Sequence, residues 1–343
     1  MKTTIRMAAA SLAAILLLSA PVRGLEVSAR QAVLLDGYSG EALWEKDPDT
    51  PALIASTTKI MTALVVLERC GLQEMVEIPP EAAGVEGSSM YLRAGEVLTV
   101  EDLLYGLMLA SGNDAAAALA IHTAGSLEAF TALMNEKAAD LGLRDMHFAN
   151  PHGLDSPENY ASPRSLGRLA MAALDNPDFR AIVSTRRRTA GDRVLVNHNR
   201  LLGQYPGAIG VKTGYTRAAG RILVGAAERE GRRLISVTLS APDDWEDHRR
   251  MLDYGFSRYE TRPLVTAGQQ VGTIPLLFGD RDALPLLAEE TVVFPLLPGE
   301  TPEYRIVALP YVTSAHTGSA GTLQVFLHGR LVGQTAVRAA PPA

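Results

Sequence analysis

The feature that most constrains the fold is the division of the strand-like segments into two groups that lie far apart in the sequence. Two short runs lie near the N-terminus, within residues 30–44, and three more follow one another within residues 208–239. The five runs are 30–36, 41–44, 208–212, 221–227 and 234–239. One sheet that contains both groups must carry the long segment between them as an insertion. This order predicts an α/β fold, with a sheet packed against helices and a largely helical insert.

Helices are predicted in the intervening segment, and one more follows the last strand. The six helical runs are 56–70, 99–109, 114–122, 126–141, 164–174 and 244–254. In the first of them, Ile60, Leu64 and Leu67 fall on one face. Gly71 is expected to end this helix in the left-handed conformation. Residues 214–220 are expected to form the turn after strand 208–212.

The pattern changes after Pro263, where short apolar runs are broken by glycine and proline. This pattern is typical of strands joined by tight turns. We therefore expect two domains, a larger α/β domain over residues 25–260 and a small all-β domain over residues 261–343.

The N-terminus resembles an export signal. Lys2 and Arg6 are followed by the apolar run 7–20, and small residues then offer a cleavage site after Gly24. The apolar run is too short for a comfortable membrane span. We expect residues 1–24 to be a signal peptide and the protein to work outside the cytoplasm. A retained N-terminal anchor is the alternative.

Charge and metal-ligand content exclude several classes of function. The formal net charge of −6 argues against a nucleic-acid partner, which would favour a basic face. Cys70 is the single cysteine, so no internal disulfide can form. The seven histidines include no His-Glu-x-x-His pattern, and no metal site is predicted.

The first candidate site lies in "ASTTKIMTAL", residues 55–64, where Ser56 stands three residues before Lys59. In a structural interpretation, Ser56 caps the helix and Lys59 extends along an apolar surface. In a catalytic interpretation, Lys59 lies one turn from Ser56 on the same face and takes its proton, which makes the hydroxyl a nucleophile. Backbone N–H groups at the helix start could then stabilise an oxyanion. The pair alone does not decide between the two.

The second candidate stretch is "ASGND", residues 110–114, at the predicted junction of two helices. Ser111 could relay a proton, and Asn113 could hold both Lys59 and a substrate amide. The alternative is a plain helix connection in which Asn113 or Asp114 serves as a cap.

The third stretch is "GVKTGYT", residues 210–216. Lys212 offers a second cation that would lower the pKa of Lys59, and Thr213 offers a hydroxyl for a carboxylate. Gly214 leaves room for close approach. A nucleotide-binding loop is disfavoured, because Val211 stands where such a loop needs glycine before its lysine.

The three motifs in this order resemble the penicillin-recognising serine enzymes. Their spacings are 111 − 56 = 55 and 212 − 111 = 101 residues. With "LMLASGNDAAAALA", "HFANPHGLDSPENYASPRSLGRLA" and "YPGAIGVKTGYTRAAGRILVGA", the chain is similar to the D-alanyl-D-alanine carboxypeptidases among the low-molecular-mass penicillin-binding proteins. The resemblance implies a β-lactamase-like fold and hydrolysis of the terminal D-Ala-D-Ala bond of peptidoglycan stem peptides through an acyl-serine. It also implies covalent inhibition by β-lactams and the absence of a metal or organic cofactor.

The resemblance also assigns roles to residues that match the family motifs. The implied catalytic residues are the nucleophile Ser56, its base Lys59, and Ser111. The implied substrate-binding residues are Asn113, Lys212, Thr213 and Gly214. The implied oxyanion donors are the backbone N–H groups of Ser56 and Tyr215.

The sequence departs from the family at three places. Tyr215 stands where many relatives have histidine, and the neighbourhood of Asp244 stands where some have an arginine for the substrate carboxylate. The final residues, "GRLVGQTAVRAAPPA", show no amphipathic anchoring helix, although a membrane surface stays open as a partner.

Two rival activities use the same kind of site. A serine β-lactamase would need a second carboxylate base, and Glu158 in "SPENY" lies in a suitable loop without the matching surroundings. A D,D-endopeptidase acting on cross-links would use the same residues, and the sequence does not separate it from a carboxypeptidase. A catalytically silent wall-binding protein would be expected to have lost Ser56 or Lys59.

Overall fold

The computed structural model describes residues 25–279, 281–313, 316 and 318–340. The predicted signal peptide, residues 1–24, lies outside the described residues. Among the described helices, no single one is long and apolar enough to cross a membrane. One helix pair, Asn113–Ala124 with Leu127–Asp140, passes the same test by length and composition, with a bend of 85° between its members.

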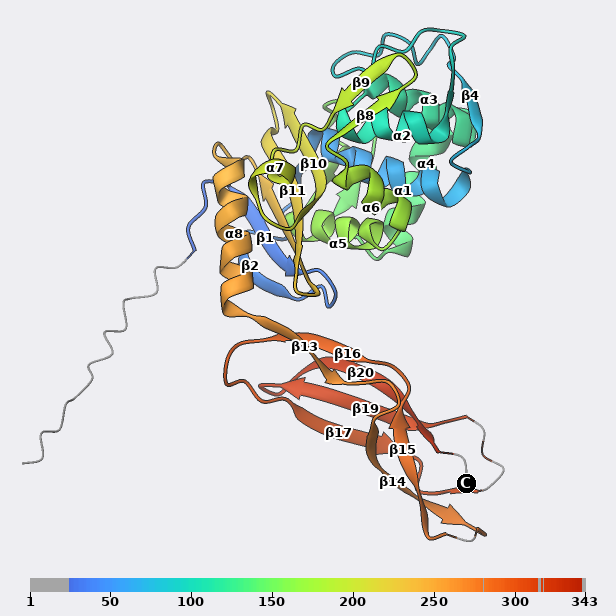
Figure 1. Cartoon of the computed structure of the whole chain (residues 1–343), viewed down its shortest axis with the longest axis vertical. Coiled ribbons are helices and arrows are strands. Elements are labelled where there is room, and N and C mark those ends of the chain that lie inside the picture. Colours follow the sequence, from blue (N-terminus) through green and yellow to red (C-terminus); the bar gives the residue numbers. More distant parts are fainter. Residues whose placement is uncertain (1–24, 280, 314–315, 317, 341–343) are drawn as a thin grey trace, which may run out of the picture.

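A five-stranded antiparallel sheet unites the two predicted groups of strands (Figure 1). Its order is β10-β11-β12-β1-β2. The strands are β1 (Gln31–Asp36), β2 (Ala42–Lys46), β10 (Ala208–Thr216), β11 (Gly220–Arg229) and β12 (Arg232–Leu239). The N-terminal hairpin joins the sheet through β1, which pairs with β12 from Gln31 opposite Leu239 to Asp36 opposite Leu234. The predicted α/β fold with a helical insert is confirmed.

Helices cover both faces of this sheet (Figure 1). The helices are α1 (Lys59–Arg69), α2 (Val100–Leu109), α3 (Asn113–Ala124), α4 (Leu127–Asp140), α5 (Pro163–Leu174), α6 (Pro177–Ser184), α7 (Leu201–Gln204) and α8 (Asp244–Arg258). Alternate residues of a strand face opposite sides, so Val33 and Leu35 join the core under the helical insert. Ala32 and Leu34 join a second core on the other face, with Met251 of α8.

The helical insert packs closely around an alanine-rich helix. The run 115–120 in α3 is fully buried, and α3 contacts α1, α2 and α4. Short side chains allow neighbouring helices to approach closely. This packing holds the N-terminal ends of α1 and α3 close to the edge strand β10.

Three small two- and three-stranded ladders complete this part of the chain. They contain β3 (Ala52–Leu53), β6 (Met146–His147), β7 (Tyr160–Ala161), β4 (Met75–Glu77), β5 (Val97–Thr99), β8 (Arg187–Ala190) and β9 (Arg193–Val196).

Two local predictions are wrong. Helix α1 ends at Arg69, Cys70 is already extended, and Gly71 does not adopt the left-handed conformation. Its N–H instead donates to the Glu74 carboxylate at 2.6 Å. Strand β10 does not stop at Lys212 but runs to Thr216, with Gly214 paired opposite Ile222.

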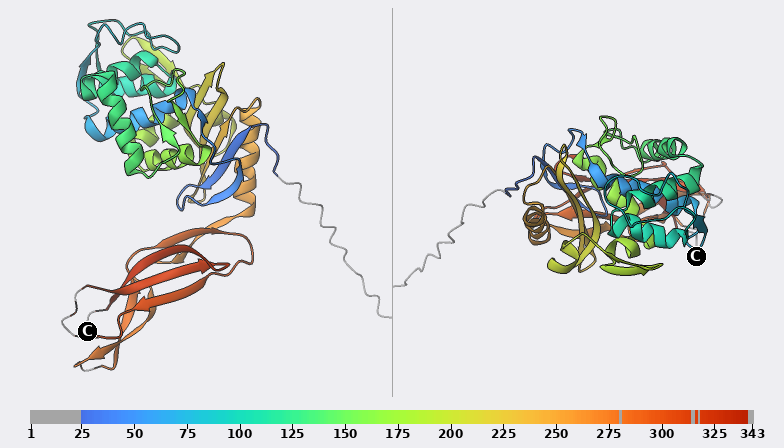
Figure 2. Two further views of the ribbon diagram at one scale, coloured as in Figure 1. Left: turned by 180° about the vertical axis from the view of Figure 1, so that it is seen from behind. Right: turned by 90° about the horizontal axis from the view of Figure 1, so that it is seen from above.

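The chain continues after α8 into strands, and the described residues from 260 onward contain no helix. These strands are β13 (Glu260–Val265), β14 (Gln270–Leu277), β15 (Ala283–Ala288), β16 (Val292–Leu296), β17 (Glu303–Ala308), β18 (Val312–Thr313), β19 (Ser319–Leu327) and β20 (Arg330–Ala339). Six of them form the sheet β17-β19-β20-β15-β14-β18. They surround an apolar core of their own and extend away from the helical insert (Figure 2).

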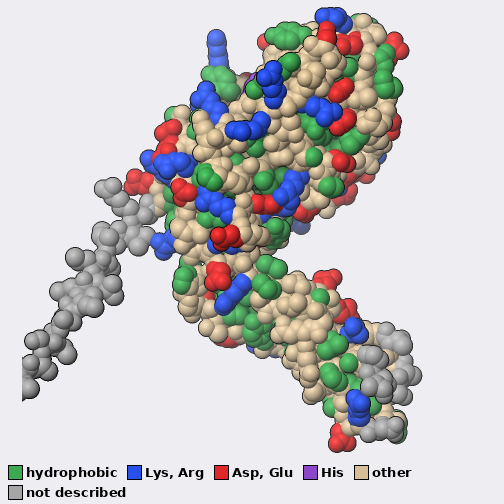
Figure 3. All heavy atoms as spheres, viewed as in Figure 1, with side chains coloured by type: hydrophobic (Ala, Val, Ile, Leu, Met, Phe, Trp, Pro, Cys, Tyr) green, Lys and Arg blue, Asp and Glu red, His purple; other side chains and the backbone are tan. Residues whose placement is uncertain are grey.

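Polar contacts join the two parts near the end of α8. Thr261 donates to the buried carboxylate of Asp36 at 2.6 Å, and the same carboxylate accepts the Ser39 N–H in the β1–β2 turn. Arg330 donates to Glu41 at 2.6 Å. Basic and acidic side chains are mixed over the visible face of the molecule, without a large field of one sign (Figure 3).

Candidate active site

The structure excludes both parts of the structural interpretation of Ser56 and Lys59. Ser56 lies inside a short 3-10 turn, Ala55–Thr58, whose flanking cap residue is Ile54, and α1 begins at Lys59 with Thr58 as its cap residue. Ser56 is therefore not the cap of α1. Lys59 does not reach solvent either, because its side chain is 0% exposed.

Three oxygen atoms surround the Lys59 amine. Its Nζ donates to Ser56 Oγ at 3.0 Å, to Asn113 Oδ1 at 2.7 Å and to the His152 carbonyl at 2.5 Å. The Asn113 and His152 oxygens can only accept, whereas a hydroxyl can also donate. When Lys59 is neutral, its two N–H groups satisfy those two oxygens, and its lone pair is left to accept the Ser56 proton.

The electrostatic surroundings favour the neutral amine. Burial lowers the pKa of Lys59 well below its usual value, and the charge of Lys212 lowers it further, while Asp114 opposes the shift. Burial also lowers the pKa of Lys212, to about 7. A lysine with such a lowered pKa can serve as a general base near neutral pH.

The second motif lies at the junction of α2 and α3 and faces the first. Asn113 is the first residue of α3, and its amide nitrogen donates to the Glu86 carbonyl at 2.5 Å, which leaves Oδ1 for Lys59. Ser111 has a left-handed backbone, with φ 62°, and its hydroxyl accepts from Lys212 at 3.0 Å.

The third motif lies along β10, where successive side chains point to opposite sides. Lys212 is 1% exposed and points toward Ser111, whereas Thr213 lines the open cleft. Gly214 packs against the nucleophile turn, since a Cβ there would lie 3.3 Å from Ala55 Cβ and from Ser56 N. The glycine is thus explained by close approach and not by a turn.

Sequence reasoning missed the contribution of the loop after residue 149. His152 supplies the carbonyl that Lys59 contacts, and the Pro151 carbonyl accepts from Thr62 of α1 at 2.6 Å. Gly153 has a left-handed φ of 89°, and a Cβ on it would lie 2.0 Å from the Ala55 carbonyl oxygen and 2.9 Å from Ser56 N. Its sequence signal was "NPHGLD", which indicated only a loop.

Substitution of Gly153 by alanine is therefore expected to damage the site more than the fold. The new methyl group must push the backbone of Ala55 and Ser56 away, and a displacement of about 1 Å at a reacting group can cost roughly a hundredfold in rate. The measurement is the rate of acylation by penicillin. Gly231→Ala is the matched control, because Gly231 also has a positive φ but its Cβ would meet nothing within 4 Å. Normal acylation by folded Gly153→Ala would contradict this role.

The three motifs open on one cleft of about 530 Å³. It is lined by Ser56, Ser88, Ser111, Asn197, His198, Arg200, Thr213, Gly214, Tyr215, Arg221, Asp244 and Trp245. Burial lowers the pKa of His198, and nearby Lys212 lowers it further. Neither Arg200 nor Arg221 belongs to a sequence motif that would assign it to the site.

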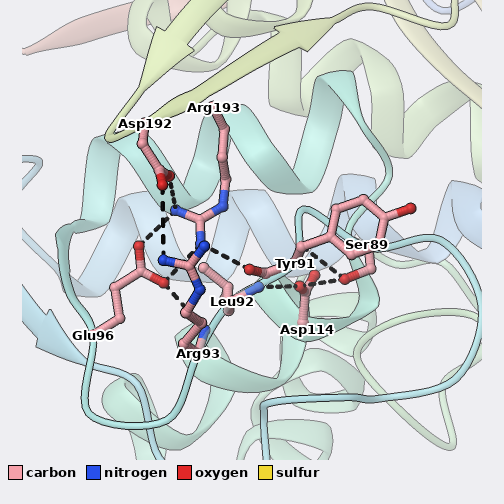
Figure 4. Close-up of polar contacts among 8 residues, drawn as sticks. All are labelled: Ser89, Tyr91, Leu92, Arg93, Glu96, Asp114, Asp192 and Arg193. Atoms are coloured by element: carbon pink, nitrogen blue, oxygen red, sulfur yellow. Dashed lines mark hydrogen bonds and ion pairs between the residues drawn. The ribbon is translucent and has the colours of Figure 1, made fainter.

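Asp114 and Arg193 hold the loop between β4 and β5, residues 78–96, on one side of the cleft (Figure 4). The buried Asp114 carboxylate accepts from Ser89 Oγ at 2.6 Å and from the Leu92 N–H at 3.0 Å. Arg193 donates to the Tyr91 carbonyl at 2.7 Å and pairs with Glu96. The same loop contains Ser88, which lines the cleft, and Glu86, whose carbonyl accepts from Asn113. The contacts of Asp114 and Arg193 therefore help to hold Asn113 in position.

One group of potential metal ligands lies outside the cleft. Among the described residues, the ligand atoms of Cys70, Glu74 and His122 lie within 4.8 Å of one another. Cys70 follows the C-terminal end of α1, whereas Ser56 precedes its N-terminal end. The cluster is therefore no part of the site formed by the three motifs.

Comparisons with known proteins agree with this arrangement. A family model described as D-alanyl-D-alanine carboxypeptidase matches residues 18–243. D-alanyl-D-alanine carboxypeptidase DacF of Bacillus subtilis is 35% identical over 277 residues, which cover 77% of this chain and 71% of that protein. DacB2 of Mycobacterium tuberculosis is 36% identical over 237 residues, 66% of this chain and 81% of that protein.

Solved structures show the same likeness over most of the chain. Penicillin-binding protein 5 from Haemophilus influenzae superimposes with a TM-score of 0.82 at 28% identity, covering 92% of this chain and 97% of that one. The carboxypeptidase DacD from Francisella tularensis gives 0.73 at 27% identity, with 92% and 93% covered. Its three motifs, its fold and these relatives together show that the chain belongs to the D-alanyl-D-alanine carboxypeptidase family of serine peptidases.

Proposed function

We propose that this protein removes the terminal D-alanine from peptidoglycan stem pentapeptides through an acyl intermediate on Ser56. The observation that carries the proposal is the buried Lys59 amine, whose only hydroxyl partner among its three contacts is Ser56. The direct test is incubation with a pentapeptide that ends in D-Ala-D-Ala, with free D-alanine as the readout.

The proposed reaction has two steps. Lys59 takes the Ser56 proton while Oγ attacks the carbonyl carbon of the scissile bond, and the N–H groups of Ser56 and Tyr215 stabilise the oxyanion. Collapse of this intermediate breaks the C–N bond, and the leaving D-alanine nitrogen receives the proton that Lys59 took from Ser56, relayed by the Ser111 hydroxyl, which accepts a hydrogen bond from Lys212. Lys59, neutral again, then takes a proton from the attacking water and returns it to Ser56 Oγ as the acyl bond breaks, which releases the shortened peptide and frees Ser56. The chain supplies every group used, so the proposal needs no metal or organic cofactor.

Substrate binding is proposed to involve Asn113, Lys212, Thr213 and Gly214. Gly214 lets β10 lie against the nucleophile turn, and β10 is the outer strand of the sheet, so an extended peptide could pair with its free edge. The Lys212 amine points toward Ser111, so its positive charge is proposed to act on the substrate carboxylate at a distance. The Thr213 hydroxyl is proposed to bind that carboxylate directly.

Thr213→Val tests this role of the hydroxyl. Valine keeps the shape, and the loss of one hydrogen bond to a charged group is expected to lower kcat/KM for a D-Ala-D-Ala peptide by roughly tenfold to a hundredfold. The C-terminal amide of the same peptide should be affected much less. An equal loss for acid and amide would mean that Thr213 does not read the carboxylate.

The same site is proposed to bind β-lactams covalently, and the rival activities are distinguished by their products. The Glu158 side chain is 71% exposed and does not line the cleft, which disfavours rapid β-lactamase turnover. We expect slow release of penicillin. Endopeptidase action would appear as cleavage of cross-linked dimers at a rate comparable to D-alanine release.

We also propose a function for each segment of the chain. Residues 1–24 would direct export, residues 25–260 would form the catalytic domain, and residues 261–343 would form a separate β domain. Action on peptidoglycan requires an extracytoplasmic location. A protein found with residues 1–24 intact in the cytoplasm would contradict the export proposal.

A further inference from the structure

The cleft contains an arginine that none of the proposed catalytic steps uses. Arg221 is the second residue of β11 and pairs opposite Tyr215. Its side chain is 45% exposed and lines the same cleft as Ser56 and Thr213. Thr213 pairs opposite Leu223, two residues along β11 from Arg221. Because side chains alternate along a strand, Thr213 and Arg221 lie on the same face of the sheet.

A buried carboxylate holds one part of this arginine. Arg221 donates through one terminal nitrogen to Asp244 Oδ1 at 2.8 Å, and Asp244 is only 4% exposed. The same oxygen accepts the backbone N–H of Trp245 at 3.0 Å, at the first turn of α8. A guanidinium carries several N–H donors in a rigid fork. Within the described part of the chain the guanidinium of Arg221 makes no other hydrogen bond, so its remaining donors are available on the cleft side.

The charges around the cleft favour an anion next to Arg221. Arg200 and Arg221 both line it, whereas Asp244 is the single acidic residue among the described residues of the lining. Arg200 lies over the ring of Trp245, 5.9 Å from its centroid, at the same end of the cleft. A half-buried guanidinium with free donors is well suited to a charge-assisted bond with a carboxylate.

We propose that Arg221 binds the C-terminal carboxylate of the substrate together with the Thr213 hydroxyl, in an orientation fixed by Asp244. This inference rests on the proposed function and adds a specificity residue to it. The neighbourhood from which some relatives supply an arginine is occupied here by Asp244, so the positive charge reaches the cleft from β11. Asp244 therefore holds Arg221 in its orientation and does not itself bind the substrate carboxylate.

The test compares kcat/KM for a D-Ala-D-Ala peptide acid and for its C-terminal amide. Arg221→Gln is expected to lower the value for the acid by about tenfold to a hundredfold, mainly through KM, and to leave the amide within about twofold. Arg217→Gln is the matched control, since Arg217 is an exposed arginine that does not line the cleft. It should change neither value.

Two results would overturn the assignment. They are an unchanged acid-to-amide ratio in Arg221→Gln, whether both values fall equally or neither falls, and a loss of acid preference in Arg200→Gln but not in Arg221→Gln. If Arg221→Gln does not fold, Arg221→Lys decides, because it keeps the charge without the fork. A lower acid-to-amide ratio supports the proposal, and an unchanged ratio refutes it.

Failure of the proposed function is recognised separately. The native protein would then release no D-alanine and form no penicillin adduct. If it does both and the acid-to-amide ratio is insensitive to Arg221, only the role of Arg221 is lost.

Discussion

Substitution of Lys59 by arginine or by methionine is expected to abolish acylation of Ser56 by penicillin, for two different reasons. Arginine keeps the positive charge but does not give up its proton under working conditions. Methionine removes the amine and its lone pair altogether. Loss of a general base costs about a hundredfold to ten-thousandfold in rate. The measurement is the time course of adduct formation by intact-mass analysis.

The two variants separate chemistry from folding. Methionine places no charge in this fully buried position, but it leaves the Asn113 and His152 oxygens without their donor, so the free energy of unfolding is expected to fall by about 1–3 kcal/mol. Arginine stays charged in the same position and is expected to cost more. Lys137→Met, which removes a lysine paired with Glu68 on the outside of the helical insert, is the control and should acylate normally. Near-normal acylation by folded Lys59→Met would refute the role of the base. In the native enzyme, the rate should fall as the pH decreases through the lowered pKa of Lys59, because protonation removes the lone pair.

Ser56→Ala is expected to eliminate both the penicillin adduct and D-alanine release. The hydroxyl is the atom to which the acyl group becomes attached, so no alternative route through this site exists once it is removed. The Lys59 amine would keep its contacts with Asn113 and His152, so thermal stability should change little. Any D-alanine release that remains should equal the uncatalysed rate in buffer.

Peptide mapping of the adduct formed by the native protein identifies the acylated residue directly. Ser88 and Ser111 also line the cleft and serve as internal alternatives. The modified peptide should contain Ser56. An adduct on Ser88 or Ser111, or an adduct that persists in Ser56→Ala, would show that the nucleophile has been assigned wrongly.

Much of the site could be predicted because its motifs combine short spacing with local structure. In a helical segment, the spacing of three residues between Ser56 and Lys59 places both side chains one turn apart on the same face. This relation depends only on local structure. The strand groups also predicted one sheet with a helical insert, but not that β1 pairs with β12. What these patterns could not provide was the depth of burial of Lys59, because burial depends on α3 and on the loop at His152, both distant in sequence.

The misses have the same physical origin. Glycine commonly marks turns, so the pattern predicts a turn at Gly214, but this residue lies within β10. The room for close approach that the sequence also predicts at Gly214 is used for contact with Ala55. Gly153 gave only a loop signal, although it packs against the same turn. Arg221 carried no motif, and its meaning depends on Asp244, 23 residues later in the chain. Contacts between distant segments leave no local pattern.

The left-handed backbone at Ala55 and Ser111 sets a limit on how this enzyme can be improved. Both residues bear a Cβ, yet φ is 45° at Ala55 and 62° at Ser111, a conformation that costs about 1–3 kcal/mol at each position. Selection for heat resistance alone would favour Ala55→Gly, which relieves the cost but frees the backbone next to the nucleophile. Thermostability and turnover are therefore opposed at this position, and an engineered heat-stable variant should draw its gains from the β domain and the outer helices.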